Sequence, residues 1–216
     1  MPRKTARPRP TVVLLVRHGQ TPTTGKLLPG RAPGLHLSEA GEAQAQAVGQ
    51  RLASQPKLKV DAIYASPLER TKETAGFIAG ALGLKVKLDK GLLEADIGDW
   101  TGQELKAVAK LPEWKAVHAY PSGFRFPGGE SFVEMQSRTV SALERLRQAH
   151  PGQTIVAVSH ADTIKAAVAH ALGTHLDLFQ RIVISPCSVT AIAYGDGGPT
   201  VLSVNSVGDG PAPNPS

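Results

Sequence analysis

The sequence has one cysteine, few aromatic residues and no long apolar run. Because Cys187 stands alone, the chain can form no internal disulfide and no zinc site with several cysteine ligands. No segment approaches the roughly 20 apolar residues of a membrane-spanning helix. The apolar residues 12–16 are too few for a signal peptide and lead directly into Arg17 and His18. We therefore expect a cytoplasmic protein that binds no membrane.

The net positive charge is also small once the first ten residues are set aside. Of a formal net charge of +6, four units come from the first ten residues, which hold no acid: Arg3, Lys4, Arg7 and Arg9. A basic folded surface for nucleic acid is therefore poorly supported, and we expect no nucleic-acid partner. Residues 1–10 and the Gly- and Pro-rich residues 206–216 are predicted to be disordered. Residues 11–205 are long enough for a single domain.

Short apolar runs alternate with helical patterns along the chain. Strands are predicted at residues 12–16, 62–65, 86–88 and 154–158, with closing strands at 182–184, 189–194 and 200–204. Helices are predicted at residues 38–54, from about 69 to 83, from the capping box at Ser131, and after residue 160. This order predicts an α/β fold, a three-layer α/β/α sandwich with a mostly parallel central sheet.

The middle of the chain, residues 89–130, is rich in glycine and proline and is predicted to form a lid-like segment. Long segments with little regular structure in compact domains are often functional. One short helix is expected at about residues 102–110, and Trp100 and Trp114 are expected to pack the segment rather than to bind a ligand.

Two arginines and two histidines follow predicted strands. Arg17 and His18 come at the end of the first strand, Arg70 follows the second, and His160 follows the strand that ends at residue 158. Because ligands bind beyond the carboxyl ends of strands in such sheets, these four side chains are expected to meet.

This set of side chains suits phosphoryl transfer. Arginine presents planar donors that match phosphate oxygens, and a neutral imidazole is a competent nucleophile. A carboxyl group must protonate the leaving oxygen, and Glu94 and Asp96 in the middle segment are the candidates.

Four segments carry a resemblance to a known family. They are residues 15–21 (LVRHGQT), 66–71 (SPLERT), 94–102 (EADIGDWTG) and 159–162 (SHAD). In this order they resemble the elements of the histidine phosphatase superfamily, which has the phosphoglycerate mutase-like fold. The match extends from residue 15 to about 194.

The resemblance implies a role for each site residue. His18 would be phosphorylated on its ring, and Glu94 would give a proton to the leaving group and later take one from water. Arg17, Arg70 and His160 would bind the phosphoryl group. The residues that would line the pocket are Gln20, Thr21, Thr24 and Ala161. Thr24 stands where the family often has Asn, and Ala161 where it often has Gly. No metal and no cofactor are implied.

Protonation states follow from these roles. His18 must be neutral to attack, whereas His160 is expected to help more as a cation. Because Glu94 must hold a proton in the first step, we expect a pH optimum below neutrality. Asp162 could support the site, but we expect it to cap the helix after His160.

Within the family, the sequence favours the broad phosphatase branch over a mutase. Family mutases have a Tyr soon after the catalytic Glu and an adjacent arginine pair; here Ile97 follows Glu94 by three positions and no Arg-Arg pair exists. The expected substrate is a small phosphorylated metabolite. A phosphoglycerate mutase-type activity and a noncatalytic phospholigand-binding module remain as alternatives.

Overall fold

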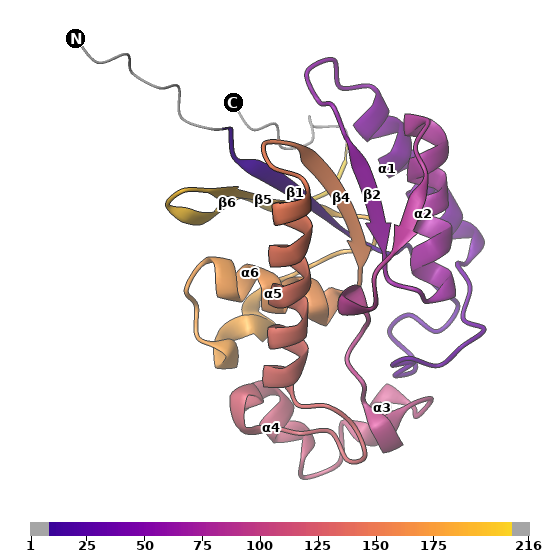
Figure 1. Cartoon of the computed structure of the whole chain (residues 1–216). Helices are drawn as coiled ribbons and strands as arrows, with labels where there is room; N and C mark the ends of the chain where they lie inside the picture. The colour runs from indigo at the N-terminus through magenta and orange to yellow at the C-terminus, as the bar shows by residue number, and fades with distance from the viewer. Residues whose placement is uncertain (1–8, 209–216) are drawn as a thin grey trace.

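A six-stranded mixed sheet forms the middle layer of the molecule (Figure 1). The computed structural model describes residues 9–208; of the residues predicted to be disordered, 1–8 and 209–216 lie outside this range, and Ser206 ends the last strand. The strand order is β3-β2-β4-β1-β5-β6; the first four strands are mutually parallel, and β5 is antiparallel to both of its neighbours, β1 and β6. The strands are β1 (Thr11–Arg17), β2 (Ala62–Ala65), β3 (Val86–Leu88), β4 (Thr154–Ser159), β5 (Val189–Gly195) and β6 (Gly198–Ser206). The predicted α/β fold with a mostly parallel sheet is confirmed.

The central strand β1 is apolar from Val12 to Val16 because both of its faces are covered. Val12, Leu14 and Val16 lie in the core on one side of the sheet. Val13 and Leu15 lie in the core on the other side. Successive side chains of a strand point to opposite faces, so a strand buried on both faces has no polar alternation.

Two helices cover each face of the sheet (Figure 1). On one face lie α1 (Glu39–Ala53) and α2 (Glu69–Leu82); on the other lie α5 (Phe132–Ala149) and α6 (Ala161–Ala171). The predicted ends are confirmed: the Ser38 hydroxyl accepts from the Gly41 amide, Gly83 ends α2 in the left-handed region, and Ser131 forms a capping box with Glu134. No helix within residues 9–208 is long and apolar enough to cross a membrane.

The middle segment lies at the end of the molecule toward which the parallel strands point (Figure 1). Its regular structure is short: 3-10 turns η1 (Lys90–Leu92), η2 (Gly98–Trp100) and η3 (Pro121–Gly123), and helices α3 (Leu105–Val108) and α4 (Trp114–Ala119). The helix expected at residues 102–110 is thus only one turn, and α4 was not predicted. Aromatic rings pack the segment onto α5, with Trp100 5.5 Å from Phe126 and Phe126 5.1 Å from Phe132 between ring centroids. Trp100 is buried and Trp114 packs against the same cluster, so their predicted packing role is confirmed.

The strand predicted at residues 182–184 does not form. A 3-10 helix, η4 (Leu176–Arg181), precedes these residues, and they continue as irregular chain. Ile184 is buried, which explains the apolar pattern. Its carbonyl, however, accepts a hydrogen bond from Arg17 Nη1 at 2.7 Å instead of joining a strand ladder.

Candidate active site

The two predicted site histidines lie side by side. β1 and β4 are parallel, with Arg17 opposite Ser159, so the residues after both strands leave the sheet together. The His18 amide donates to the Ser159 carbonyl at 3.0 Å. The His18 and His160 ring centroids are 5.2 Å apart, in an edge-to-face arrangement. The structure thus brings the first and last of the four motifs together.

The surroundings of His18 fix both its tautomer and its charge. Its Nδ1 lies 2.7 Å from the Gly19 carbonyl oxygen, which can only accept, so Nδ1 carries the hydrogen and Nε2 keeps a free lone pair. Burial and the nearby Arg70 lower the pKa of His18 to about 3, and Arg17 acts in the same direction. His18 is therefore a neutral imidazole at physiological pH, as the predicted role of nucleophile would require.

Arg17 and Arg70 hold donors that no described group accepts. Arg70, in the first turn of α2, is 1% exposed; its Nη2 donates to the Gly30 carbonyl at 2.8 Å, while its Nε and Nη1 have no partner within residues 9–208. Arg17 Nε is likewise buried without an acceptor in that range. Buried donors without partners cost free energy, and guanidinium donors are suited to oxyanions. The arrangement can hold a phosphoryl group.

His160 supplies one more donor but not the expected charge. Its Nε2 lies 2.9 Å from the Ser66 hydroxyl, and its buried Nδ1 has no hydrogen-bond partner among the described residues. Burial lowers the pKa of His160 well below its usual value, and His18 and Arg70 add to this effect. The protein groups around His160 therefore favour its neutral form over the expected cation. With Ser66 donating to Nε2, a neutral His160 can still donate from Nδ1.

Glu94 has the properties of a proton donor. Its Oε2 lies 4.0 Å from His160 Nδ1, and its Oε1 accepts from the Ala95 amide at 3.0 Å. Burial raises the pKa of Glu94, the negative charge of Asp162 raises it further, and Arg70 opposes both effects. Glu94 therefore keeps its proton to higher pH than an ordinary carboxyl group.

Asp96, the other candidate acid, is engaged elsewhere. Its Oδ2 pairs with Arg31 Nη1 at 3.3 Å and its Oδ1 accepts from the Gly98 amide at 3.2 Å. Its side chain is 45% exposed. These contacts favour Glu94 as the acid of the site.

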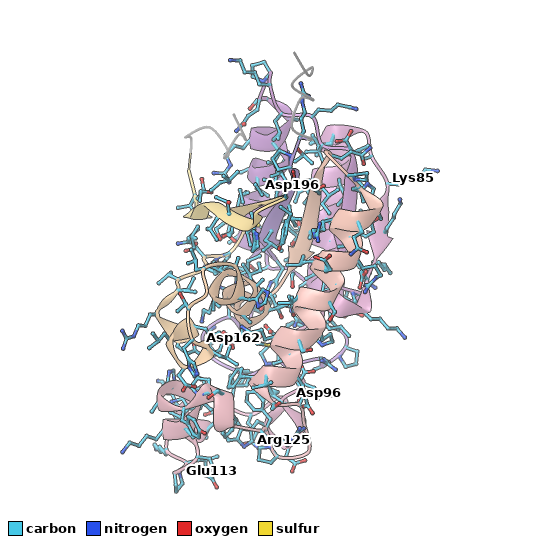
Figure 2. The ribbon with its side chains drawn as sticks, turned by 60° about the vertical axis from the view of Figure 1, so that its left-hand side comes forward. Lys85, Asp96, Glu113, Arg125, Asp162 and Asp196 are labelled. Carbon is cyan, nitrogen blue, oxygen red and sulfur yellow. The ribbon has the colours of Figure 1, made fainter. Side chains whose placement is uncertain are left out.

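Asp162 does not cap its helix, contrary to the prediction. His160 occupies the N-cap position of α6, and Asp162 lies in the first turn, where its carboxylate binds Lys165 Nζ at 3.0 Å. Figure 2 places Asp162 and Asp96 in the same half of the molecule, away from Asp196. The charge of Asp162 instead reaches Glu94 and Arg17, which makes it an electrostatic support of the site.

The predicted pocket residues lie in the loop after β1 and at the start of α6. Thr24 Oγ1 accepts from the Thr21 amide at 2.9 Å, so its hydroxyl stabilises the turn of this loop. The Gln20 amide donates to Gln44 Oε1. Ala161 is the first residue of α6. The roles of Gln20, Thr21, Thr24 and Ala161 in binding a substrate stay predictions.

Two glycines bring this loop onto α1. A Cβ on Gly19 would lie 2.4 Å from the Gly41 carbonyl oxygen, and one on Gly41 would lie 2.0 Å from the Gln20 carbonyl oxygen. Neither position has room for a side chain. Gly19 belongs to the LVRHGQT segment, whereas Gly41 belongs to none of the four segments and meets the loop only in the folded chain.

Three charged residues around the Glu94 main chain were not predicted from the sequence. Arg31, Glu130 and Arg138 form an ion-pair network there. Both arginines also donate to backbone carbonyls, Arg31 to that of Glu94 and Arg138 to those of Gly91, Leu93 and Glu94, and no sequence motif identifies such acceptors. Within residues 9–208, no group of three or more His, Cys, Asp and Glu side chains is placed to hold a metal ion.

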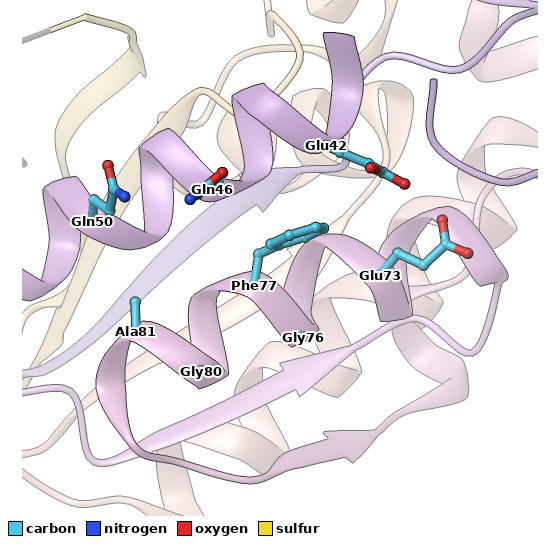
Figure 3. A pocket seen from close by; sticks show the side chains of 8 residues that line it. All are labelled: Glu42, Gln46, Gln50, Glu73, Gly76, Phe77, Gly80 and Ala81. Atoms are coloured by element: carbon cyan, nitrogen blue, oxygen red, sulfur yellow. The ribbon is translucent and has the colours of Figure 1, made fainter. Parts of the chain in front are cut away.

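A groove on the outer side of α1 and α2 lies apart from this site (Figure 3). Its volume is about 740 Å³, and Phe77 of α2 lies between the two helices. The lining residues are Glu42, Gln46, Gln50, Glu73, Gly76, Phe77, Gly80 and Ala81. None of them is a predicted site residue, and the groove holds no histidine or arginine.

Comparisons with known proteins identify relatives of this chain. The Bifunctional protein Rv2228c of Mycobacterium tuberculosis is 34% identical over 207 residues, covering 94% of this chain; the chain spans 56% of the length of that relative. Phosphoserine phosphatase 1 of Hydrogenobacter thermophilus is 33% identical over 198 residues, covering 89% of this chain and 91% of the relative. Other relatives, from Salmonella, are named as probable phosphoglycerate mutases.

Solved structures share the fold. A mutant phosphoserine phosphatase from Entamoeba histolytica, in complex with phosphoserine, has a TM-score of 0.81 at 28% identity and covers 91% of this chain and 97% of its own. Residues 13–207 match the family profile of the histidine phosphatase superfamily, branch 1. This protein therefore belongs to the histidine phosphatase superfamily.

Proposed function

We propose that this protein hydrolyses small phosphomonoesters through a phosphohistidine formed on His18. One observation carries the proposal: a neutral imidazole with a free Nε2 lies beside buried N–H groups of Arg17, Arg70 and His160 that have no acceptor among the described residues. A nucleophile surrounded by donors for an oxyanion suits transfer of a phosphoryl group.

In the first step, Nε2 of His18 attacks phosphorus. The N–P bond forms while the bond between phosphorus and the ester oxygen breaks. The carboxyl proton of Glu94 moves to the leaving oxygen, so the alcohol departs neutral. The donors of Arg17, Arg70 and His160 bind the other phosphoryl oxygens, where negative charge is concentrated. The raised pKa of Glu94 supports this assignment because it keeps the donor protonated.

In the second step, water attacks the phosphohistidine. The Glu94 carboxylate takes a proton from the water, the new P–O bond forms, and the N–P bond breaks. Phosphate leaves, His18 regains its lone pair and Glu94 its proton. Both steps use only side chains of this chain and water, so we propose that neither a metal nor a cofactor takes part.

The choice between hydrolysis and mutase chemistry rests on the middle segment. Ile97 stands three positions after Glu94, and Arg125 in this segment binds Glu134 and the Gly129 carbonyl on its own rather than beside a second arginine. This supports release of phosphate to water over its return to a phosphorylated product. Relatives named as phosphoserine phosphatases and a neighbour in complex with 3-phosphoglyceric acid support a small phosphorylated metabolite as substrate.

A substrate panel tests the proposal. The purified protein, with chelator present, is assayed for phosphate release from phosphomonoesters that include phosphoserine and 3-phosphoglycerate, with His18→Ala as the control. We expect release by the wild type and loss of at least about 10³-fold in the variant, because the nucleophile is gone. Isomerisation of phosphoglycerate without net release would replace hydrolysis by mutase activity. Absence of turnover on the whole panel would contradict both.

A further inference from the structure

The main-chain carbonyl of Glu94 is held by two arginines from distant parts of the chain. Arg31, in the loop between β1 and α1, donates from Nε at 2.8 Å, and Arg138 of α5 donates from Nη2 at 3.4 Å. Glu130 lies between them, with its Oε1 3.0 Å from Arg31 Nη2 and 2.7 Å from Arg138 Nη2. The same oxygen accepts from the amide of Asp96 at 3.1 Å.

The loop that carries Arg31 also contacts the proposed phosphoryl site. Arg70 Nη2 donates to the carbonyl of Gly30, the residue just before Arg31. Gly30 has a φ of +48°, and a Cβ there would lie 2.6 Å from Ile97 Cγ1. This close packing leaves the Gly30–Arg31 peptide little freedom. Two adjacent residues therefore connect a phosphoryl-binding arginine to the main chain of the proton donor.

We propose that Arg31 is a positioning residue for Glu94. The proposal rests on the proposed function, since it concerns the proton that Glu94 delivers. Arg31 contacts the carbonyl of Glu94 and the carboxylates of Asp96 and Glu130; its only hydrogen bond to Glu94 is to the main chain. It therefore fixes the place of the Glu94 carboxyl group through the backbone rather than through direct contact with the acid.

Positioning of this kind has a specific kinetic consequence. A general acid must come within hydrogen-bond reach of the leaving oxygen, and a misplacement of about 1 Å can cost roughly 10²-fold in rate. Alkyl esters need the proton because an alkoxide is a poor leaving group. Aryl esters of acidic phenols need it little, because the phenolate leaves unaided. Loss of positioning should therefore harm alkyl esters selectively.

The test compares Arg31→Met with the wild type on p-nitrophenyl phosphate and on an alkyl phosphate that the wild type hydrolyses. The readout is kcat/KM, because it reports phosphorylation of His18 and excludes the later hydrolysis common to both esters. We expect a loss of about 10- to 100-fold on the alkyl ester and less than about threefold on the aryl ester. Glu94→Gln should show the same selectivity with a larger amplitude.

Matched variants separate positioning from other effects. Arg147→Met removes an arginine of α5 that pairs with Glu144 on the surface, and should change neither rate. If circular dichroism shows that Arg31→Met does not fold, Arg31→Lys takes its place. This variant keeps the positive charge but loses the planar donors, so it should show the same loss on the alkyl ester at smaller amplitude. Equal losses on both esters, or no loss, would overturn the positioning role. A wild type inactive on every phosphomonoester would instead overturn the proposed function, and this inference with it.

Discussion

Two pairs of arginines act on Glu94, and they differ in how their donors are used. Arg17 and Arg70 influence the charge of its carboxyl group and keep buried N–H groups without partners in the described chain. Arg31 and Arg138 bind its carbonyl and share the carboxylate of Glu130. The pairs also differ in exposure: Arg70 is 1% exposed, whereas the side chains of Arg31 and Arg138 are 28% and 24% exposed.

The difference separates a binding surface from a framework. A buried donor without an acceptor costs about 1–3 kcal/mol, so folded proteins keep few of them. Arg17 and Arg70 bear this cost where four motifs of the chain meet, which indicates donors kept for a ligand. The donors of Arg31 and Arg138 are used within the fold, which indicates residues that hold the site in shape. Each prediction below tests one side of this comparison.

The largest effect is expected for Arg70→Met. Removing donors from the transferring phosphoryl group should lower kcat/KM by about 10²–10³-fold, on alkyl and aryl esters alike. The free energy of unfolding should stay unchanged or rise, because the variant buries an apolar side chain in place of a cation with unpartnered N–H groups. Steady-state kinetics and thermal unfolding measure the two quantities.

Phosphate binding provides the control for Arg70→Met. Inorganic phosphate at 100 times its dissociation constant should stabilise the wild type by about 2.7 kcal/mol. The same concentration should stabilise Arg31→Met nearly as much and Arg70→Met much less. If Arg31→Met lost this stabilisation while Arg70→Met kept it, the assignment of the two pairs would be reversed.

Arg138→Met is expected to show the opposite pattern to Arg70→Met. The variant leaves Glu130, whose side chain is 15% exposed, with one cation fewer, and it removes bonds to the carbonyls of Gly91 and Leu93. The free energy of unfolding should fall by about 1–3 kcal/mol. Chemical denaturation gives the value. The double variant with Glu130→Gln should lose less free energy of unfolding than the sum of the two single losses, because both residues belong to one network. Strictly additive losses would contradict such a network.

Much of the fold could be predicted because its signals are local. The unbroken apolar run of β1, the cap at Ser38 and the capping box at Ser131 depend on neighbours within a few residues. The strand expected at residues 182–184 failed for the opposite reason. Apolar pattern reports burial, but the partner of the Ile184 carbonyl is Arg17, far away in the sequence.

The site shows the same limit. Arg17, His18, Arg70 and His160 could be predicted to meet because each follows a strand of one parallel sheet. Arg31 and Arg138 could not, since each binds both a carboxylate and backbone carbonyls, and these acceptors come together only in the folded chain. The expected charge of His160 took no account of its complete burial, which lowers its pKa and could not be read from the sequence. Asp162 was predicted to cap a helix because Asp is common at helix starts. Its effect on the pKa of Glu94 acts through space and depends on the folded structure.

The smallest effect is expected for Asp162→Asn, and it appears only in the pH profile. The negative charge of Asp162 raises the pKa of Glu94, and the first step requires protonated Glu94. As pH rises through that pKa, kcat/KM for an alkyl ester should fall. Removing the charge lowers the pKa of Glu94, so the fall should begin at lower pH, while the rate on the acidic side stays unchanged.

Glu144→Gln is the matched control for this shift, because it removes a carboxylate of α5 that binds Arg147 at the surface. Its profile should coincide with that of the wild type. In Arg31→Met, kcat/KM should be lower at every pH, but the alkaline limb should stay at its wild-type pH. The reason is that Arg31 controls the position of the Glu94 carboxyl group, whereas Asp162 controls its pKa. A limb that stayed in place or moved to higher pH in Asp162→Asn would show that the proton in the first step does not come from Glu94.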